Sequence, residues 1–75
     1  MKIEILGTGC PKCKQLEMNV RKAVEEKNVK ANIIKVTDIT KIMEYGVMST
    51  PAIVIDGEVK VYGRLADVKE IKKLL

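Results

Sequence analysis

The only two cysteines of the chain lie three residues apart, in the stretch Gly7-Thr8-Gly9-Cys10-Pro11-Lys12-Cys13. An apolar run that reads as a strand precedes this stretch, and a run with a helical period follows it. Two thiols at this spacing on the first turn of a helix either close a small disulfide loop or bind a soft metal ion. The rest of the sequence has to decide between these two chemistries.

The whole-chain composition narrows the class of protein. A length of 75 residues predicts one domain, spanning 1–75, and 47% apolar with 32% charged residues indicates a folded chain. The net charge of +4 is spread out, without a basic run longer than a pair, so we expect no nucleic-acid partner. We find neither a signal peptide nor an apolar run of the ~18 residues that a membrane span needs, and therefore expect a cytoplasmic monomer that does not enter a membrane. In that compartment, a close cysteine pair is more often catalytic or metal-binding than structural.

The elements on either side of the cysteines are predicted from periodicity. Apolar and charged residues alternate over Lys2–Leu6, which predicts a strand. From Pro11 the period becomes helical, and Pro11 suits the first helical position because its missing N–H is not needed there. The helix should end at Lys27-Asn28, where a basic last turn precedes a residue that tolerates a left-handed backbone. Its inward stripe contains Cys13, Leu16, Val20, Ala23 and Val24.

The next elements complete a parallel crossover. Ala31–Thr37 reads as a second strand, and Asp38 is suited to cap a short helix over residues 39–45 that Gly46 ends. Two strands joined by a long helix imply a right-handed parallel connection.

The last third of the chain predicts a hairpin and a final helix. Ala52–Ile55 and Glu58–Tyr62 flank Asp56-Gly57, and an Asp-Gly pair between two such runs is a strong hairpin signal. Asp67 and Glu70 have the spacing of a capping box, before a helix with an apolar side. The predicted order is β-α-β-α-β-β-α, an α/β fold.

This plan divides the two thiols between two roles. Cys10 falls at the N-cap or first position of the long helix, where free backbone N–H groups, the helix dipole and Lys12 favour the thiolate. Cys13 lies on the inward stripe and should be shielded. An exposed attacking thiol beside a shielded one is the arrangement that dithiol–disulfide exchange needs.

Several motifs together resemble the thioredoxin/glutaredoxin superfamily, most of all its small prokaryotic redox-active disulfide proteins. These motifs are Cys10-Pro11-Lys12-Cys13 after the first strand, Thr50-Pro51 before the third, the Asp56-Gly57 hairpin and Gly63 before the last helix. The resemblance covers essentially the whole chain. It implies a thioredoxin-like four-stranded mixed sheet in the order 2-1-3-4, with the first and third helices on one face.

The resemblance also implies roles for residues and partners. Cys10 is the expected nucleophile and Cys13 the resolving thiol of a protein-disulfide reductase. Pro51 is expected to be cis, and the backbone of Thr50 to pair with substrate, next to Pro11 and Lys12. No cofactor is expected beyond the redox-active Cys10–Cys13 pair, since the cysteines carry the two electrons. The expected partners are disulfide-containing proteins, with a reductase or glutathione as electron donor.

The sequence departs from both named subfamilies. Gly9 stands where thioredoxins have Trp, and Pro11-Lys12 replaces their Gly-Pro, whereas glutaredoxins have Tyr at Lys12. Arg64 follows Gly63 where glutaredoxins have a second glycine. Arg64 and Lys12 are the two cations that could meet a glutathione carboxylate. Glu4 stands six residues before Cys10, where thioredoxins carry a buried carboxylate, but alternation does not tell which face Glu4 occupies.

Two other functions remain open at this stage. Copper- or zinc-carrying metallochaperones are of similar size and have a similar Cys-x-x-Cys loop, and two thiolates suit Cu(I). Their order ends in a strand, however, and Thr8 replaces their usual Met. A structural zinc site would need four ligands, and the chain has two cysteines and no histidine. A non-enzymatic redox sensor or scaffold of the same fold is the second alternative.

Overall fold

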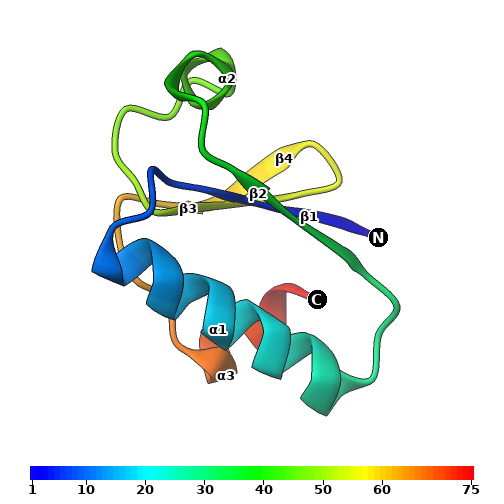
Figure 1. Cartoon of the computed structure of the whole chain (residues 1–75). Helices are drawn as coiled ribbons and strands as arrows, with labels where there is room; N and C mark the ends of the chain where they lie inside the picture. The colour runs from blue at the N-terminus through cyan, green and yellow to red at the C-terminus, as the bar shows by residue number, and fades with distance from the viewer.

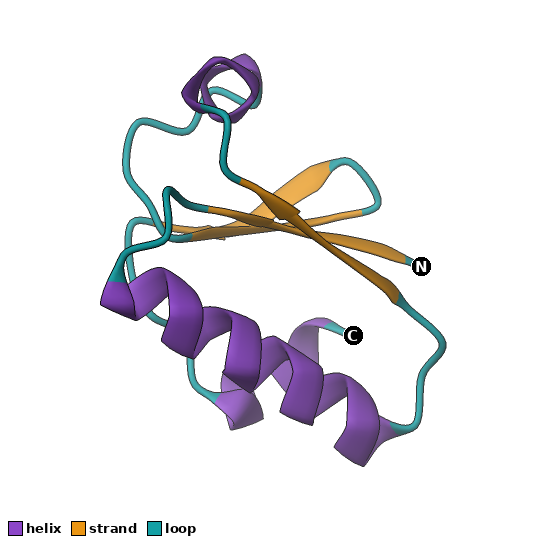
Figure 2. Cartoon of the chain, viewed as in Figure 1, coloured by secondary structure: helices purple, strands orange, loops and turns teal.

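The computed structural model describes residues 1–75 and consists of one four-stranded sheet and three helices. The helices are α1 (Pro11–Lys27), α2 (Ile39–Glu44) and α3 (Val68–Leu74). α1 and α3 lie side by side on one face of the sheet, and α2 lies on the other face (Figure 1). Figure 2 shows the resulting layers, with the strands between the helices.

The sheet has the order β2-β1-β3-β4. Its strands are β1 (Lys2–Leu6), β2 (Asn32–Val36), β3 (Ala52–Ile55) and β4 (Glu58–Tyr62). β1 pairs with β2 in parallel and with β3 antiparallel, and β3 pairs antiparallel with β4. The mixed sheet in the order 2-1-3-4 and the β-α-β-α-β-β-α order are thereby confirmed.

The pairing of β1 with β3 brings two distant segments to one end of the sheet. Leu6 lies opposite Ala52 in this antiparallel pair. Gly7, which follows Leu6, and Pro51, which precedes Ala52, therefore leave the sheet at the same end. The cysteine stretch and the Thr50-Pro51 segment are neighbours for this reason.

Both faces of the central strands are buried in separate apolar clusters. The cluster beneath α1 and α3 consists of Ile3, Ile5, Leu16, Val20, Ala23, Ile53, Ile55, Val61, Ala66 and Ile71. The cluster beneath α2 consists of Leu6, Val36, Ile42, Val47, Ala52 and Val54. Successive residues of β3 alternate between the two clusters, as the period of two in a strand requires, and in β1 Ile5 belongs to the first cluster and Leu6 to the second. Each helix is therefore fixed by its own apolar contacts with the sheet.

The turn and cap residues largely behave as the sequence predicts. Asn28 ends α1 in a left-handed conformation, with φ of 54°, and Asp38 accepts a hydrogen bond from the amide of Thr40 at the start of α2. Asp56 and Gly57 have φ of 50° and 84°, the positive values that a two-residue hairpin turn of this hand needs.

Only one of the two hydrogen bonds of the predicted capping box forms at the start of α3. Asp67 accepts a hydrogen bond from the amide of Glu70 at 2.8 Å. The Glu70 carboxylate does not return to the cap, because Arg64 binds both of its oxygens. A charged bidentate pair is stronger than a hydrogen bond to a neutral amide, which explains the difference.

Candidate active site

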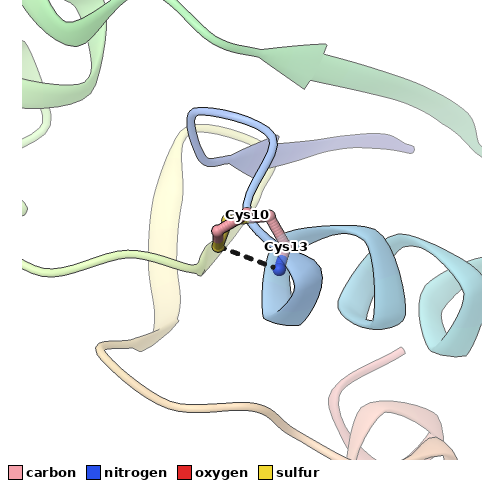
Figure 3. Close-up of a disulfide and its surroundings, with 2 residues drawn as sticks. All are labelled: Cys10 and Cys13. Atoms are coloured by element: carbon pink, nitrogen blue, oxygen red, sulfur yellow. Dashed lines mark hydrogen bonds between the residues drawn. A yellow bond between two sulfur atoms is a disulfide. The ribbon is translucent and has the colours of Figure 1, made fainter.

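Cys10 is the N-cap residue of α1, and Pro11 occupies the first helical position. The extended backbone of Cys10, with φ of −67° and ψ of 162°, directs its side chain back over the first turn. Its Sγ accepts a hydrogen bond from the backbone amide of Cys13 at 3.2 Å, drawn in Figure 3. A sulfur in this position meets one of the helix amides that have no partner within the helix.

Cys10 and Cys13 are joined by a disulfide, with their Cα atoms 5.0 Å apart (Figure 3). The two cysteine residues differ in exposure: Cys13 is 6% exposed, whereas Cys10 is only half-buried. A reagent that approaches this disulfide from solvent therefore meets Cys10 first.

The charges around the first turn favour a thiolate at Cys10. The first turn of α1 contains no acidic residue, and Lys12 lies exposed beside the disulfide. The positive end of the helix dipole and the Cys13 amide act on the same sulfur. No carboxylate in this turn opposes them.

Gly7 packs directly against the inner cysteine. A Cβ on Gly7 would lie 2.9 Å from Cβ of Cys13 and closer still to its Sγ. The backbone at the end of β1 thus covers the buried side of the disulfide, and no side chain other than hydrogen fits there.

The Thr50–Pro51 segment lies at the same end of the sheet. The peptide bond between them is cis, and Pro51 is fully buried at the entrance to β3. The carbonyl of Pro51 accepts a hydrogen bond from the amide of Gly63 at 3.0 Å, which connects the segment to the end of β4. Thr50 is half-buried and shares a groove with Thr8, two residues before Cys10.

Glu4 lies on the sheet face that α2 covers, away from α1. It is 6% exposed, and Oε2 accepts a hydrogen bond from the Tyr45 hydroxyl at 2.6 Å, while Lys2 lies 3.5 Å from Oε1. The bond to Glu4 raises the pKa of the Tyr45 hydroxyl. The Glu4 carboxylate, six residues before Cys10, therefore interacts with Tyr45 and Lys2.

A different carboxylate lies behind Cys13. Glu17, one turn along α1, lines a cavity of about 70 Å³ together with Cys13, Lys14 and Lys35. Burial alone would raise the pKa of the Glu17 carboxyl, but Arg21 at 3.0 Å and Lys35 at 3.4 Å outweigh burial and hold that pKa below its usual range. The sequence alone placed neither Glu17 nor Lys35 near the cysteines. The available signal was the spacing of four residues between Cys13 and Glu17.

The other residues singled out from the sequence differ in their exposure and in their partners. Pro11 and Lys12 are exposed on the first turn of α1. Arg64 is bound to Glu70, which raises the pKa of its guanidinium and lowers that of the Glu70 carboxyl. The structure contains no cluster of three or more potential metal-ligating side chains.

Comparison with known proteins shows which family the chain belongs to. The family model for the thioredoxin domain matches residues 1–75, the whole chain. The chain belongs to the thioredoxin family. It is 45% identical over 75 residues to a thioredoxin of Methanothermobacter thermautotrophicus, covering 100% of this chain and 97% of that relative. It is also 48% identical over 73 residues to a thioredoxin of Methanocaldococcus jannaschii, covering 97% of this chain and 84% of that relative.

Membership in this family and the Cys10–Cys13 disulfide identify the chain as a thiol–disulfide oxidoreductase. Proteins of this kind act on disulfide substrates and receive electrons from a reductase. The metallochaperone alternative is not better supported, because the family model that matches the whole chain is that of the thioredoxin domain. None of the three helices is long and apolar enough to cross a membrane.

Proposed function

We propose that this thioredoxin-family domain reduces disulfides of proteins, with Cys10 as the nucleophile and Cys13 as the resolving thiol. The observation that carries this assignment is the unequal burial of the two cysteine residues on one helix turn. Cys10 is half-buried at the N-cap, and Cys13 is 6% exposed beneath Gly7. Of the two sulfurs, Cys10 is the one that a substrate disulfide reaches.

In the first step, the Cys10 thiolate attacks one sulfur of the substrate disulfide. A mixed disulfide forms at Cys10, and the other substrate sulfur leaves as a thiolate that takes up a proton. The amide of Cys13 and the helix dipole stabilise the attacking thiolate before this step.

In the second step, the Cys13 thiolate attacks Sγ of Cys10. The Cys10–Cys13 disulfide forms, the remaining substrate sulfur leaves as a thiolate, and two electrons have passed to the substrate. No cofactor takes part in this exchange. A reductase or glutathione then returns the pair to the dithiol.

Substrate would bind around Thr50, Pro51, Pro11 and Lys12. Thr50 and Pro51 lie at the same end of the sheet as the disulfide, and Pro11 and Lys12 are exposed next to Cys10. An extended segment of substrate would pair with the backbone at Thr50 while its disulfide meets Cys10. The protein would act as a monomer in the cytoplasm, without nucleic acid or membrane.

The assignment is tested by trapping the mixed disulfide on a disulfide-bonded protein such as insulin. Cys13→Ser should accumulate an adduct through Cys10 that a small dithiol releases, because no thiol remains to resolve it. The matched variant Cys10→Ser should accumulate none. Equal adducts on both variants, or none on either, would overturn the assignment of roles.

The electron donor is tested with the oxidised protein. Recovery of the dithiol is followed with NADPH and a flavin-containing reductase in one arm and with glutathione in the other. Because Arg64 is bound by Glu70, we expect the reductase arm to be the faster one. A faster glutathione arm would reverse this preference.

A further inference from the structure

The residues on either side of Cys13 in the sequence are both lysines, and both are exposed. The backbone amide of Lys14 donates a hydrogen bond to the carbonyl of Cys10 at 3.0 Å, and Lys14 lines the cavity of about 70 Å³ behind Cys13. Neither Lys12 nor Lys14 forms an ion pair within the chain. Two ammonium groups without a carboxylate partner therefore belong to the helix turn that carries the disulfide.

The one carboxylate at this cavity does not neutralise these lysines. Glu17 is the only acidic residue that lines the cavity, and it is already bound by Arg21 at 3.0 Å and by Lys35 at 3.4 Å. The first turn of α1 contains no acidic residue. This side of the disulfide therefore carries an excess of positive charge.

The two lysines flank the place that a substrate sulfur has to reach. Figure 3 shows both cysteines at the start of α1, where the helix follows the loop after β1. A polypeptide whose sulfur contacts the half-buried Cys10 brings the side chains next to that sulfur over the same helix turn. Unpaired charges beside a binding site speed the encounter with partners of opposite charge and slow the encounter with partners of like charge.

We propose that Lys12 and Lys14 form a docking site for acidic side chains of the substrate polypeptide, close in sequence to its disulfide cysteine. This inference rests on the proposed function above, since it assigns the substrate class of the same site. Aspartate and glutamate accept charge-assisted hydrogen bonds from the two ammonium groups, and lysine and arginine are repelled. A lysine side chain is a flexible point charge with three donors, so it can meet carboxylates at more than one position of the substrate.

The test measures how fast reduced Cys13→Ser reacts with short synthetic peptides that contain one cysteine. Each peptide is activated as a mixed disulfide with thiopyridine, which has no carboxylate that the lysines could bind. The Cys10 thiolate attacks the peptide sulfur, a disulfide forms between Cys10 and the peptide, and thiopyridine leaves, takes up a proton and is followed by its absorbance. The peptides carry two glutamates, two glutamines or two lysines beside the cysteine. Each rate is divided by the rate of the same peptide with mercaptoethanol, which removes differences in the reactivity of the peptides themselves.

We expect the glutamate peptide to react about three- to tenfold faster than the glutamine peptide at low salt, and the lysine peptide to react more slowly than either. An ionic strength of about 0.5 M should bring the glutamate-to-glutamine ratio close to one, because it screens exposed charges. All peptides react with the same thiolate, so the ratio does not depend on how strongly Lys12 activates Cys10.

Matched variants in the Cys13→Ser background locate the selectivity. Lys12→Gln and Lys14→Gln should each lower the glutamate-to-glutamine ratio, and the double variant should bring it close to one. Lys14→Arg should keep the ratio, because it keeps the charge. The control is Lys22→Gln, which removes the same net charge further along α1, since Lys22 is exposed, forms no ion pair and does not line the cavity.

Each outcome bears on a distinct claim. A ratio that falls in Lys12→Gln and Lys14→Gln, but not in Lys22→Gln, supports the docking site. Equal losses in all three variants would assign the preference to the net charge of the protein and overturn the docking site. If every peptide reacts through Cys10 without a preference for glutamate, the docking site is overturned while the proposed function stands. A failure of all peptides to form an adduct at Cys10 would overturn the proposed function as well.

Discussion

The Tyr45 hydroxyl donates a hydrogen bond to Oε2 of Glu4 at 2.6 Å and thereby ties the segment after α2 to the middle of β1. Glu4 is the one charged residue among the buried side chains. A buried carboxylate that loses a hydrogen-bond donor is destabilising because its desolvation is no longer offset. This contact therefore contributes to stability and has no evident role in thiol chemistry.

Tyr45→Phe should lower the folding equilibrium constant by about tenfold, because Glu4 then keeps only the longer contact with Lys2. Urea unfolding of the oxidised protein measures the change. Tyr62→Phe is the matched control, since Tyr62 is 65% exposed and makes no side-chain hydrogen bond. The pH profile of Cys10 alkylation should stay unchanged in Tyr45→Phe, and a shifted profile would show that Glu4 does act on the thiols.

Gly7→Ala should destabilise the oxidised protein by about 1–3 kcal/mol, since the new methyl group would overlap Cys13. Gly7 is the only one of the five glycines without a positive φ, so backbone strain does not add to this effect. Urea unfolding checks the loss, and Thr8→Ala in the exposed part of the same loop is the control. Equal stability of Gly7→Ala and the parent would mean that the disulfide shifts without penalty.

The contribution of Glu17 to stability should depend on pH. Its pKa is lowered from 4.5, so the folded state holds the ionised carboxylate more strongly than the unfolded chain does. The contribution is fully present above the unfolded pKa and is lost as the pH falls through the folded pKa. The stability difference between the parent and Glu17→Gln should thus shrink with acidification below pH 4.5.

The control for this titration is Glu25→Gln, on the same helix, because Glu25 is exposed and forms no ion pair. Thermal unfolding at several pH values compares the two variants with the parent. A Glu17→Gln difference that stays constant through this range would contradict the ion pairs with Arg21 and Lys35.

Lys35→Met should make Cys13 less reactive at neutral pH. Lys35 lines the cavity behind Cys13 and is held there by Glu17. In a Cys10→Ser background, we expect the midpoint of Cys13 alkylation to rise by about half a pH unit, since Lys35 is partly exposed and its charge is screened. Lys60→Met is the control on the opposite edge strand, where Lys60 pairs with Glu58 at 3.3 Å. Equal midpoints of Cys13 alkylation in the two variants would show that Lys35 does not act on Cys13.

Most of the backbone plan follows from local signals in the sequence. The change of period at Pro11, the caps at Asp38 and Asp67, and the Asp56-Gly57 turn predict elements within about one residue of those observed. The position of Cys10 at the N-cap follows directly, because it depends only on where α1 begins.

The missed features depend on contacts between distant elements. The alternation of apolar and charged residues in β1 shows that Glu4 points to the opposite face from Ile3 and Ile5, but not which helix covers that face. The hydrogen bond from Tyr45 shows that Glu4 lies on the face covered by α2. Lys35 reaches Glu17 only because β2 forms the edge next to β1. The apolar groove lined by Ile39, Met43 and Met48 likewise depends on how α2 packs on the sheet. The sequence of residues 39–48 alone does not determine this packing.

The division of labour between Cys10 and Cys13 is tested most directly by alkylation of the reduced protein as a function of pH. Rates for each cysteine are resolved by mass spectrometry of peptides after a short exposure to iodoacetamide. We expect Cys10 to react with a midpoint at least about one unit below the ~8.5 of a free thiol, and Cys13 to lag behind it at every pH. Two thiols that both titrate near ~8.5, or a Cys13 that reacts first, would contradict the account.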